Sequence, residues 1–178
     1  MSLLSSDADF IRENVHLLNT NQAYKFYKLY AKDYGCIPTD VSQLLIDAVG
    51  PQRLLNAFNN VIPDYAFADT MGWKSIVIPS SIRMVQTEAF IRTDVESIKL
   101  MPGVYSLFDG AFSSCIKLEG IILPNTIEYI GASVFEDCIA LSAIFYDGTK
   151  KEWVGVEKKD GWKNKTLTIY CKDEVFDE

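Results

Sequence analysis

A pattern of apolar positions with a period of about 23 residues runs from about residue 62 to residue 147. An apolar pair recurs at Ala66-Phe67, Ala89-Phe90 and Ala111-Phe112, and Val134-Phe135 takes the next place. Short β-branched runs that end in proline keep the same step, as in Ile121-Ile122-Leu123-Pro124. Recurrence of a whole pattern at a fixed step predicts stacked structural repeats.

Each repeat predicts one short strand followed by a return path. Apolar and polar residues alternate over three or four positions, and proline ends the strand because it cannot donate a ladder hydrogen bond. A unit of this size cannot bury its own apolar face, so we expect the units to stack into a right-handed solenoid with a parallel sheet on one side. The expected strands are 76–78, 98–100, 121–123 and 144–146, and the expected buried equivalents are Phe90, Phe112 and Phe135.

The residues before the repeats carry helical periodicity instead. A first helix is predicted by an apolar face of Phe10, Ile11, Val15 and Leu18. Three more are predicted over about 22–34, over 40–49, and from Pro51 to a point before Pro63. We therefore expect a helical N-terminal region over residues 1–61.

The residues after the repeats predict a terminal cap. The segment Thr149-Lys150-Lys151-Glu152 has the form of a capping box that opens a short helix bearing Trp153, and Trp162 follows in a loop. Residues 167–171 alternate as a final strand. The predicted fold class is therefore α/β: solenoid repeats over 62–147 lie between the helical N-terminal region and a Trp-containing C-terminal cap over 148–178.

Charge and chemistry narrow the function. The 178-residue chain has a net charge of −7, which disfavours direct binding to nucleic acid. No apolar run approaches the ~18 residues of a membrane span, and the start lacks a basic segment followed by an apolar one, so we expect a cytoplasmic protein that does not bind membranes. The cysteines Cys36, Cys115, Cys138 and Cys171 form no C-x-x-C pair, and His16 is the single histidine. These features and the absence of nucleotide, zinc or nucleophile-elbow motifs predict a non-enzyme without cofactor or metal.

The residues that point out of the predicted sheet give a candidate partner-binding site. Parity along each strand places Val77, Lys99, Ile122, Phe145 and Thr168 in one outward row. Contiguous exposed apolar residues usually mark an interface, so we expect another protein to bind there, unless the helical region or a second copy in a homodimer covers the row. The sheet face offers only roughly 250 Å², against about 800 Å² per partner in a standard interface, so a stable protein partner must also engage neighbouring surface.

The repeats resemble a known family. The stretch 118–138, Leu-Glu-Gly-Ile-Ile-Leu-Pro-Asn-Thr-Ile-Glu-Tyr-Ile-Gly-Ala-Ser-Val-Phe-Glu-Asp-Cys, is similar to the BspA-type bacterial leucine-rich repeat. The segment 145–153, together with Trp162 and 169–171, resembles the closing segment often attached to such arrays. The resemblance covers about residues 62–172 and implies a leucine-rich-repeat scaffold that binds protein partners. Surface members act in adhesion, whereas short members with a helical front end suggest a cytosolic protein of phage or mobile-element origin.

The acidity of the repeats supports an alternative function. Residues 66–147 hold ten acidic against five basic residues. Carboxylates spaced like phosphates would make the chain a decoy that inhibits a nucleic-acid-binding defence protein. The candidate carboxylates are Asp94, Glu96, Asp109, Glu119, Glu128, Glu136 and Asp137. Strong salt dependence of binding would distinguish this mode from binding through the apolar row.

Overall fold

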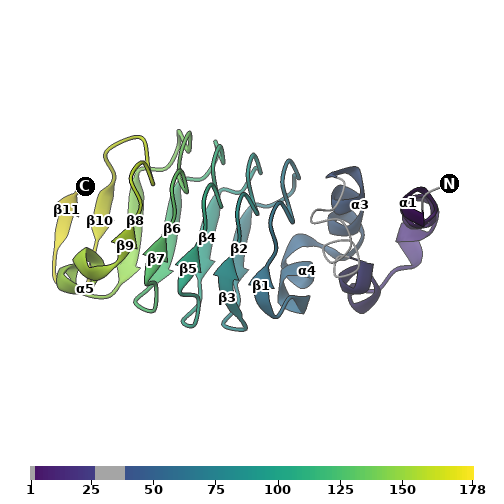
Figure 1. Ribbon diagram of the computed structural model, residues 1–178, viewed down its shortest axis with the longest axis horizontal. Helices are drawn as coiled ribbons and strands as arrows, with labels where there is room; N and C mark the ends of the chain where they lie inside the picture. The colour runs from purple at the N-terminus through teal and green to yellow at the C-terminus, as the bar shows by residue number, and fades with distance from the viewer. Residues whose placement is uncertain (1–2, 27–38) are drawn as a thin grey trace.

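The protein is an elongated stack of coils with helices at its N-terminal end (Figure 1). This computed structural model describes residues 3–26 and 39–178. The N-terminal region comprises α1 (Leu3–Asn14), the 3-10 turn η1 (Val15–Leu17), a helical segment over 20–26, α3 (Thr39–Val49) and α4 (Pro51–Ala57). The rest of the predicted second helix, and Cys36, lie outside the described residues.

The last two N-terminal helices contact the repeats. Val41, Leu45 and Ile46 of α3 are buried, and α4 begins with Pro51 directly after Gly50. Strand β1 (Asn60–Ile62) follows α4 and pairs with the first coil, inside the region that the sequence pattern assigned to helix. Three residues are too few to show strand periodicity, so only the pairing reveals this strand.

The predicted strands form a six-stranded sheet in the order β11-β10-β8-β6-β4-β2. Its parallel members are β2 (Ser75–Ile78), β4 (Ser97–Leu100), β6 (Gly120–Pro124), β8 (Ala143–Asp147) and β10 (Thr168–Tyr170), and β11 (Val175–Asp177) adds an antiparallel edge. The predicted stacking of adjacent parallel strands is confirmed. One inward isoleucine per coil is buried: Ile76, Ile98, Ile121, Ile144 and Ile169.

The return path carries a second sheet that the sequence analysis missed. Strands β1, β3 (Ile82–Val85), β5 (Ser106–Leu107), β7 (Tyr129–Ile130) and β9 (Glu157–Lys158) pair in that order, all parallel. Three of these strands have only two residues, and β3 is buried at its two ends, Ile82 and Val85, so none of them shows the alternation by which a strand is recognised in a sequence. Val85, Leu107 and Ile130, which recur at the repeat step, form one buried column in this sheet.

Stacked turns close the third side of each coil. Glu88, Gly110 and Ser133 occupy equivalent places with φ of 51°, 62° and 54°, and each N–H donates to a carbonyl of the next coil. These hydrogen bonds hold two non-glycine residues in the left-handed region. The repeated phenylalanines lie beneath: ring centroids are 5.4 Å apart for Phe90–Phe112 and 6.1 Å for Phe112–Phe135. All three are buried, as the repeat pattern predicts.

A column of small polar side chains lies beside the rings. The Cys115 thiol donates to the Phe90 carbonyl and the Cys138 thiol to the Phe112 carbonyl, both at 3.1 Å. Burial raises the pKa of Cys115 to about 11 and that of Cys138 to about 12. Both thiols are free and remain protonated at neutral pH, so their place in the structure is that of small buried side chains.

Both ends of the stack are covered. At the N-terminal end the Gln52 side chain of α4 donates to the Val77 carbonyl and accepts from the Val77 N–H, both at 2.7 Å. Gln43 of α3 binds the backbone of Met71 in the same two-way manner. The Gln52 amide therefore takes the place of a neighbouring strand at the edge of β2, and the Gln43 amide satisfies the backbone of the loop before that strand.

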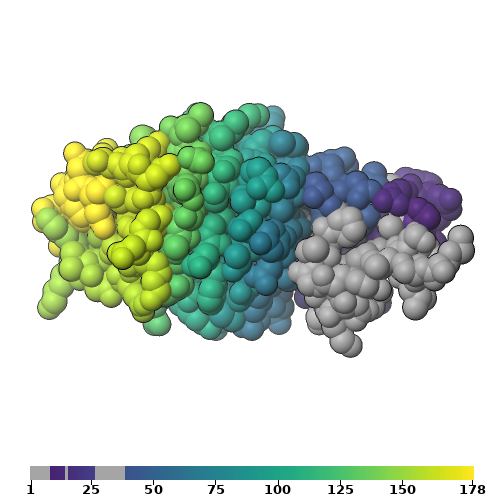
Figure 2. All heavy atoms as spheres, turned by 45° about the horizontal axis from the view of Figure 1, so that its top comes forward, coloured from purple at the N-terminus to yellow at the C-terminus, as the bar shows by residue number. Residues whose placement is uncertain are grey.

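At the C-terminal end, α5 (Lys150–Gly155) begins with the predicted capping box of Thr149 and Glu152. Trp153 and Trp162 are buried and extend the stack of rings, with centroids 6.0 Å apart for Phe135–Trp162 and for Trp153–Trp162. The N-terminal helices, the coils and this cap follow one another along a single elongated body (Figure 2).

Candidate protein-binding face

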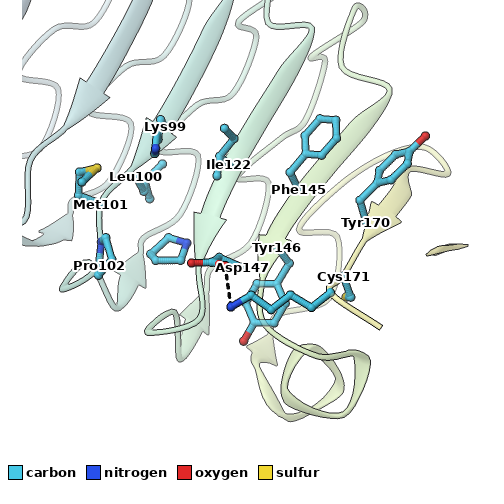
Figure 3. A pocket seen from close by; sticks show the side chains of 12 residues that line it. Lys99, Leu100, Met101, Pro102, Ile122, Phe145, Tyr146, Asp147, Tyr170 and Cys171 are labelled. Atoms are coloured by element: carbon cyan, nitrogen blue, oxygen red, sulfur yellow. Dashed lines mark ion pairs between the residues drawn. The ribbon is translucent and has the colours of Figure 1, made fainter. Parts of the chain in front are cut away.

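The strand register fixes which residues form the outward row. Val77 pairs with Lys99, Lys99 with Ile122, Ile122 with Phe145, and Phe145 with Tyr170. These five residues, with Tyr170 at the end, form the outward row of the structure. They stand side by side on neighbouring strands, and Figure 3 shows the last four of them.

The prediction that Thr168 ends the row is wrong. Thr168 pairs with Ala143, two positions from Phe145 along the strands, and its hydroxyl donates to Asp177 at 2.8 Å. The step from Ile144 to its partner Ile169 is 25 residues, because α5 and its loop lengthen this coil. With the usual repeat step of about 23 residues, Thr168 would lie beside Phe145. With the longer step, Tyr170 lies there instead.

Four of the five residues in the row are apolar or aromatic, and all five are exposed. The exposed fractions are 40 % for Val77, 39 % for Ile122, 45 % for Phe145 and 40 % for Tyr170. The helices over residues 3–26 and 39–57 therefore leave the row uncovered. The rings of Phe145 and Tyr170 stack on each other, with centroids 4.9 Å apart and planes inclined by 20°.

Lys99 is the cation in the row. Its side chain makes no ion pair within 4.0 Å among the described residues, although the chain as a whole is acidic. Its neighbours on the adjacent strands are Val77 and Ile122. The ammonium group of Lys99, between two aliphatic side chains, is the one charged group of the row.

Two open grooves flank the row. The strand-end groove, about 570 Å³, is lined by residues of the row and, towards the carboxyl ends of the strands, by Met101 and Pro102 (Figure 3). Pro124 also lines it. The second groove, about 290 Å³, lies over the small outward residues Ser75, Ser97 and Gly120. A partner therefore meets a ridge with a depression on each side.

The candidate carboxylates of the decoy hypothesis lie at several places along the coil, and two of them, Asp109 and Glu136, line one hollow over the stacked turns together with Glu88. Glu96 and Glu119 precede β4 and β6, Glu128 precedes β7, and Glu136 lies in the stacked turns. Several of the other candidate carboxylates already accept hydrogen bonds within the fold. Asp94 accepts from the backbone N–H of Trp73, and Asp109 accepts from the backbone N–H of Ala132, both at 2.9 Å. Asp137 accepts from the Asn164 side chain at 3.1 Å.

The described residues meet neither the requirements of a metal site nor those of a helical membrane span. Within 3–26 and 39–178, no three His, Cys, Asp or Glu side chains converge as a metal site would require. In the same part of the chain no helix is long and apolar enough to cross a membrane.

Stacked parallel coils with an exposed, mainly apolar strand row define a solenoid repeat scaffold of the kind used for protein interaction. The chain belongs to the BspA-type leucine-rich repeat family, whose model matches residues 56–153 in six copies. Leucine-rich repeats are generally interaction modules without catalytic activity.

Two solved structures are similar over part of the chain. A leucine-rich cell surface protein from Faecalibacterium prausnitzii is 24 % identical with a TM-score of 0.43, over 55 % of this chain and 32 % of that one. The pneumococcal vaccine antigen PcpA is 26 % identical with a TM-score of 0.39, over 49 % of this chain and 27 % of that one. The chain thus spans about a third or less of the length of these proteins. No curated protein matches it.

Proposed function

We propose that this chain is a non-catalytic protein-binding module whose contact surface is centred on the outward row. The observation that supports the proposal is the register, which sets Val77, Ile122, Phe145 and Tyr170 on one exposed sheet face. Scattered exposed apolar residues are ordinary, whereas contiguous ones mark contact sites. Aromatic residues near the centre of an interface usually dominate its energy, which makes Phe145 the main anchor and Ile122 the second.

The proposal is tested by exchanging Ile122 and Phe145 together for serine. Both side chains point away from the core, so we expect the thermal unfolding transition to stay within a few degrees of that of the wild type. Capture of the partner from an extract of the source cells, measured by quantitative mass spectrometry, is expected to fall to background. The matched control exchanges Ile139 and Val154 for serine, because both are about 70 % exposed and lie outside the row.

Each contrary result is informative. Unfolding of the double variant would show that the row is internal packing. Normal capture by a folded double variant would place the contact surface elsewhere. The decoy alternative predicts that capture declines steeply between about 50 and about 500 mM salt and is indifferent to the serine exchanges, because its contacts are ionic.

A reducing compartment, the cytosol, is part of the same proposal. Cys115, Cys138 and Cys171 are all unpaired, which supports a location in which thiols persist. Fractionation of the source cells with an antibody against the chain tests this, and recovery from the cell surface would contradict it.

A further inference from the structure

The strand-end groove has a length and a shape that suit a narrow occupant. It runs across the strands from Lys99 on β4 to Tyr170 on β10 (Figure 3). Three steps between neighbouring strands, at about 4.8 Å each, make a length of about 14 Å. An extended peptide rises about 3.3 Å per residue, so about four residues span this distance.

The size of the face disfavours a folded occupant held by the groove alone. Two copies of the chain that met row to row would bury roughly 250 Å² each, well below the roughly 1,000 Å² in total that a specific interface needs. A short segment loses less freedom for each contact when the groove is already formed. The area therefore favours a peptide segment over a second copy.

The peptide cannot join the sheet as another strand at this place. The strands β4, β6, β8 and β10 already pair with each other on both sides, so their backbone groups are occupied. Addition of a strand requires a free sheet edge. Side chains and end groups must therefore supply the recognition.

The charges of the groove select the chemistry of the occupant. Asp147 and Lys172 neutralise each other through an ion pair of 2.8 Å, shown dashed in Figure 3. Lys99 remains as the unpaired charge among the groove residues, at the end where Met101 and Ile122 are its neighbours. The groove is thus cationic at one end and apolar along its length, on a chain whose net charge is −7.

We propose that the strand-end groove binds an extended peptide segment in which an acidic residue adjoins apolar residues. The carboxylate lies against the Lys99 ammonium group, and the apolar side chains lie along Ile122, Phe145 and Tyr170. A carboxylate placed between aliphatic walls forms a partly desolvated ion pair, which contributes more to selectivity than one in open water. This inference rests on the proposed function and adds the class of ligand to it.

The test selects ligands from a random library, so the partner need not be identified first. Random peptides of about seven residues, displayed on particles, are enriched on the full chain, and the affinity of one enriched peptide is measured by fluorescence anisotropy. We expect enriched peptides to carry one Asp or Glu beside aliphatic or aromatic residues. Lys99→Glu is expected to weaken binding about tenfold, since a charge pair becomes a repulsion. The matched control is Lys151→Glu on α5, an exposed lysine outside the groove with the same change of charge.

A charge exchange completes the test. A peptide in which Lys replaces the acidic residue is expected to bind the Lys99→Glu variant better than the wild type. Enriched peptides with no acidic preference, or equal affinity for the wild type and Lys99→Glu, would overturn this inference. In that case the serine double variant Ile122→Ser, Phe145→Ser decides the proposed function separately. If it still abolished partner capture, the proposed function would stand and only the peptide inference would fall. Concentration-dependent dimerisation by sedimentation, lost in the serine double variant and with no peptide enriched, would instead assign the row to a second copy.

Discussion

Phe90, Phe112 and Phe135 show how one side chain serves several coils at once. Each ring is buried and lies against the ring of the neighbouring coil, so its packing area is shared between two repeats. The central ring, Phe112, is fully buried and has a neighbouring ring on both sides. Loss of this ring would leave a cavity that rigid stacked turns cannot close.

Phe112→Ala is therefore expected to lower the free energy of unfolding by about 3–5 kcal/mol, as measured by urea denaturation. Phe145→Ala serves as the comparison, because its ring is 45 % exposed, and its loss is expected to cost about 1 kcal/mol or less. Equal losses for the two variants would contradict the assignment of one ring to the core and the other to the surface.

The buried thiols predict a dependence of stability on pH. Burial raises the pKa of Cys115 and Cys138 above the value of about 9 for an exposed thiol, to about 11 and about 12. Above about pH 9 the unfolded chain loses these two protons while the folded protein retains them. The free energy of unfolding is therefore expected to be unaffected by these groups below about pH 8. It should fall as pH rises from about 9 towards 11, by at most about 1.4 kcal/mol per pH unit for each thiol.

Urea denaturation over this pH range, on the wild type and on a Cys115→Ala, Cys138→Ala variant, isolates the effect. The variant's profile should be the flatter of the two, whatever its absolute stability. Parallel profiles would show that the thiols ionise as readily in the folded protein as in the unfolded chain.

At the scale of the elements, helix α4 protects the edge of the sheet through two hydrogen bonds between Gln52 and Val77. Gln52 occupies both backbone groups at the free edge of β2, at the position of Val77, and so presents the sheet with a substitute for a strand. An unprotected edge of this kind is a template for association with another chain.

Gln52→Ala is expected to lower the free energy of unfolding by about 1–2 kcal/mol, because two hydrogen bonds are lost. It should also increase association in light scattering at raised protein concentration. Gln52→Glu is the sharper comparison, since its carboxylate accepts from the Val77 N–H but cannot donate to the carbonyl. An intermediate loss is expected there, and no loss in either variant would mean that the contact adds nothing to stability.

Over the whole molecule, the repeat step was the strongest signal in the sequence. It predicted the stacked strands, the column of rings and the outward places of Val77, Lys99, Ile122 and Phe145, because one period governs all of them. The capping box at Thr149 was also predicted, since its signature is local.

What the sequence pattern missed depends on pairing across the stack. In the second sheet three strands have two residues, β1 has three, and the four residues of β3 are buried only at the two ends, so no alternation was visible. The place of Tyr170 depends on a coil lengthened by α5, which breaks the period at its end. The strand-end groove arises from side chains of four coils, and the unpaired state of Lys99 is a fact of three-dimensional distance alone.

Because each coil pairs with the next along the whole sheet, the number of coils sets the length of the proposed binding groove. Gain or loss of one complete coil by gene duplication or deletion would leave both caps with the same surfaces to cover. It would change the length of the groove by one strand spacing, about 4.8 Å. Under the proposed mode of binding, the length of the peptide segment that fits the groove can therefore evolve in steps of one coil, separately from the side chains that line it.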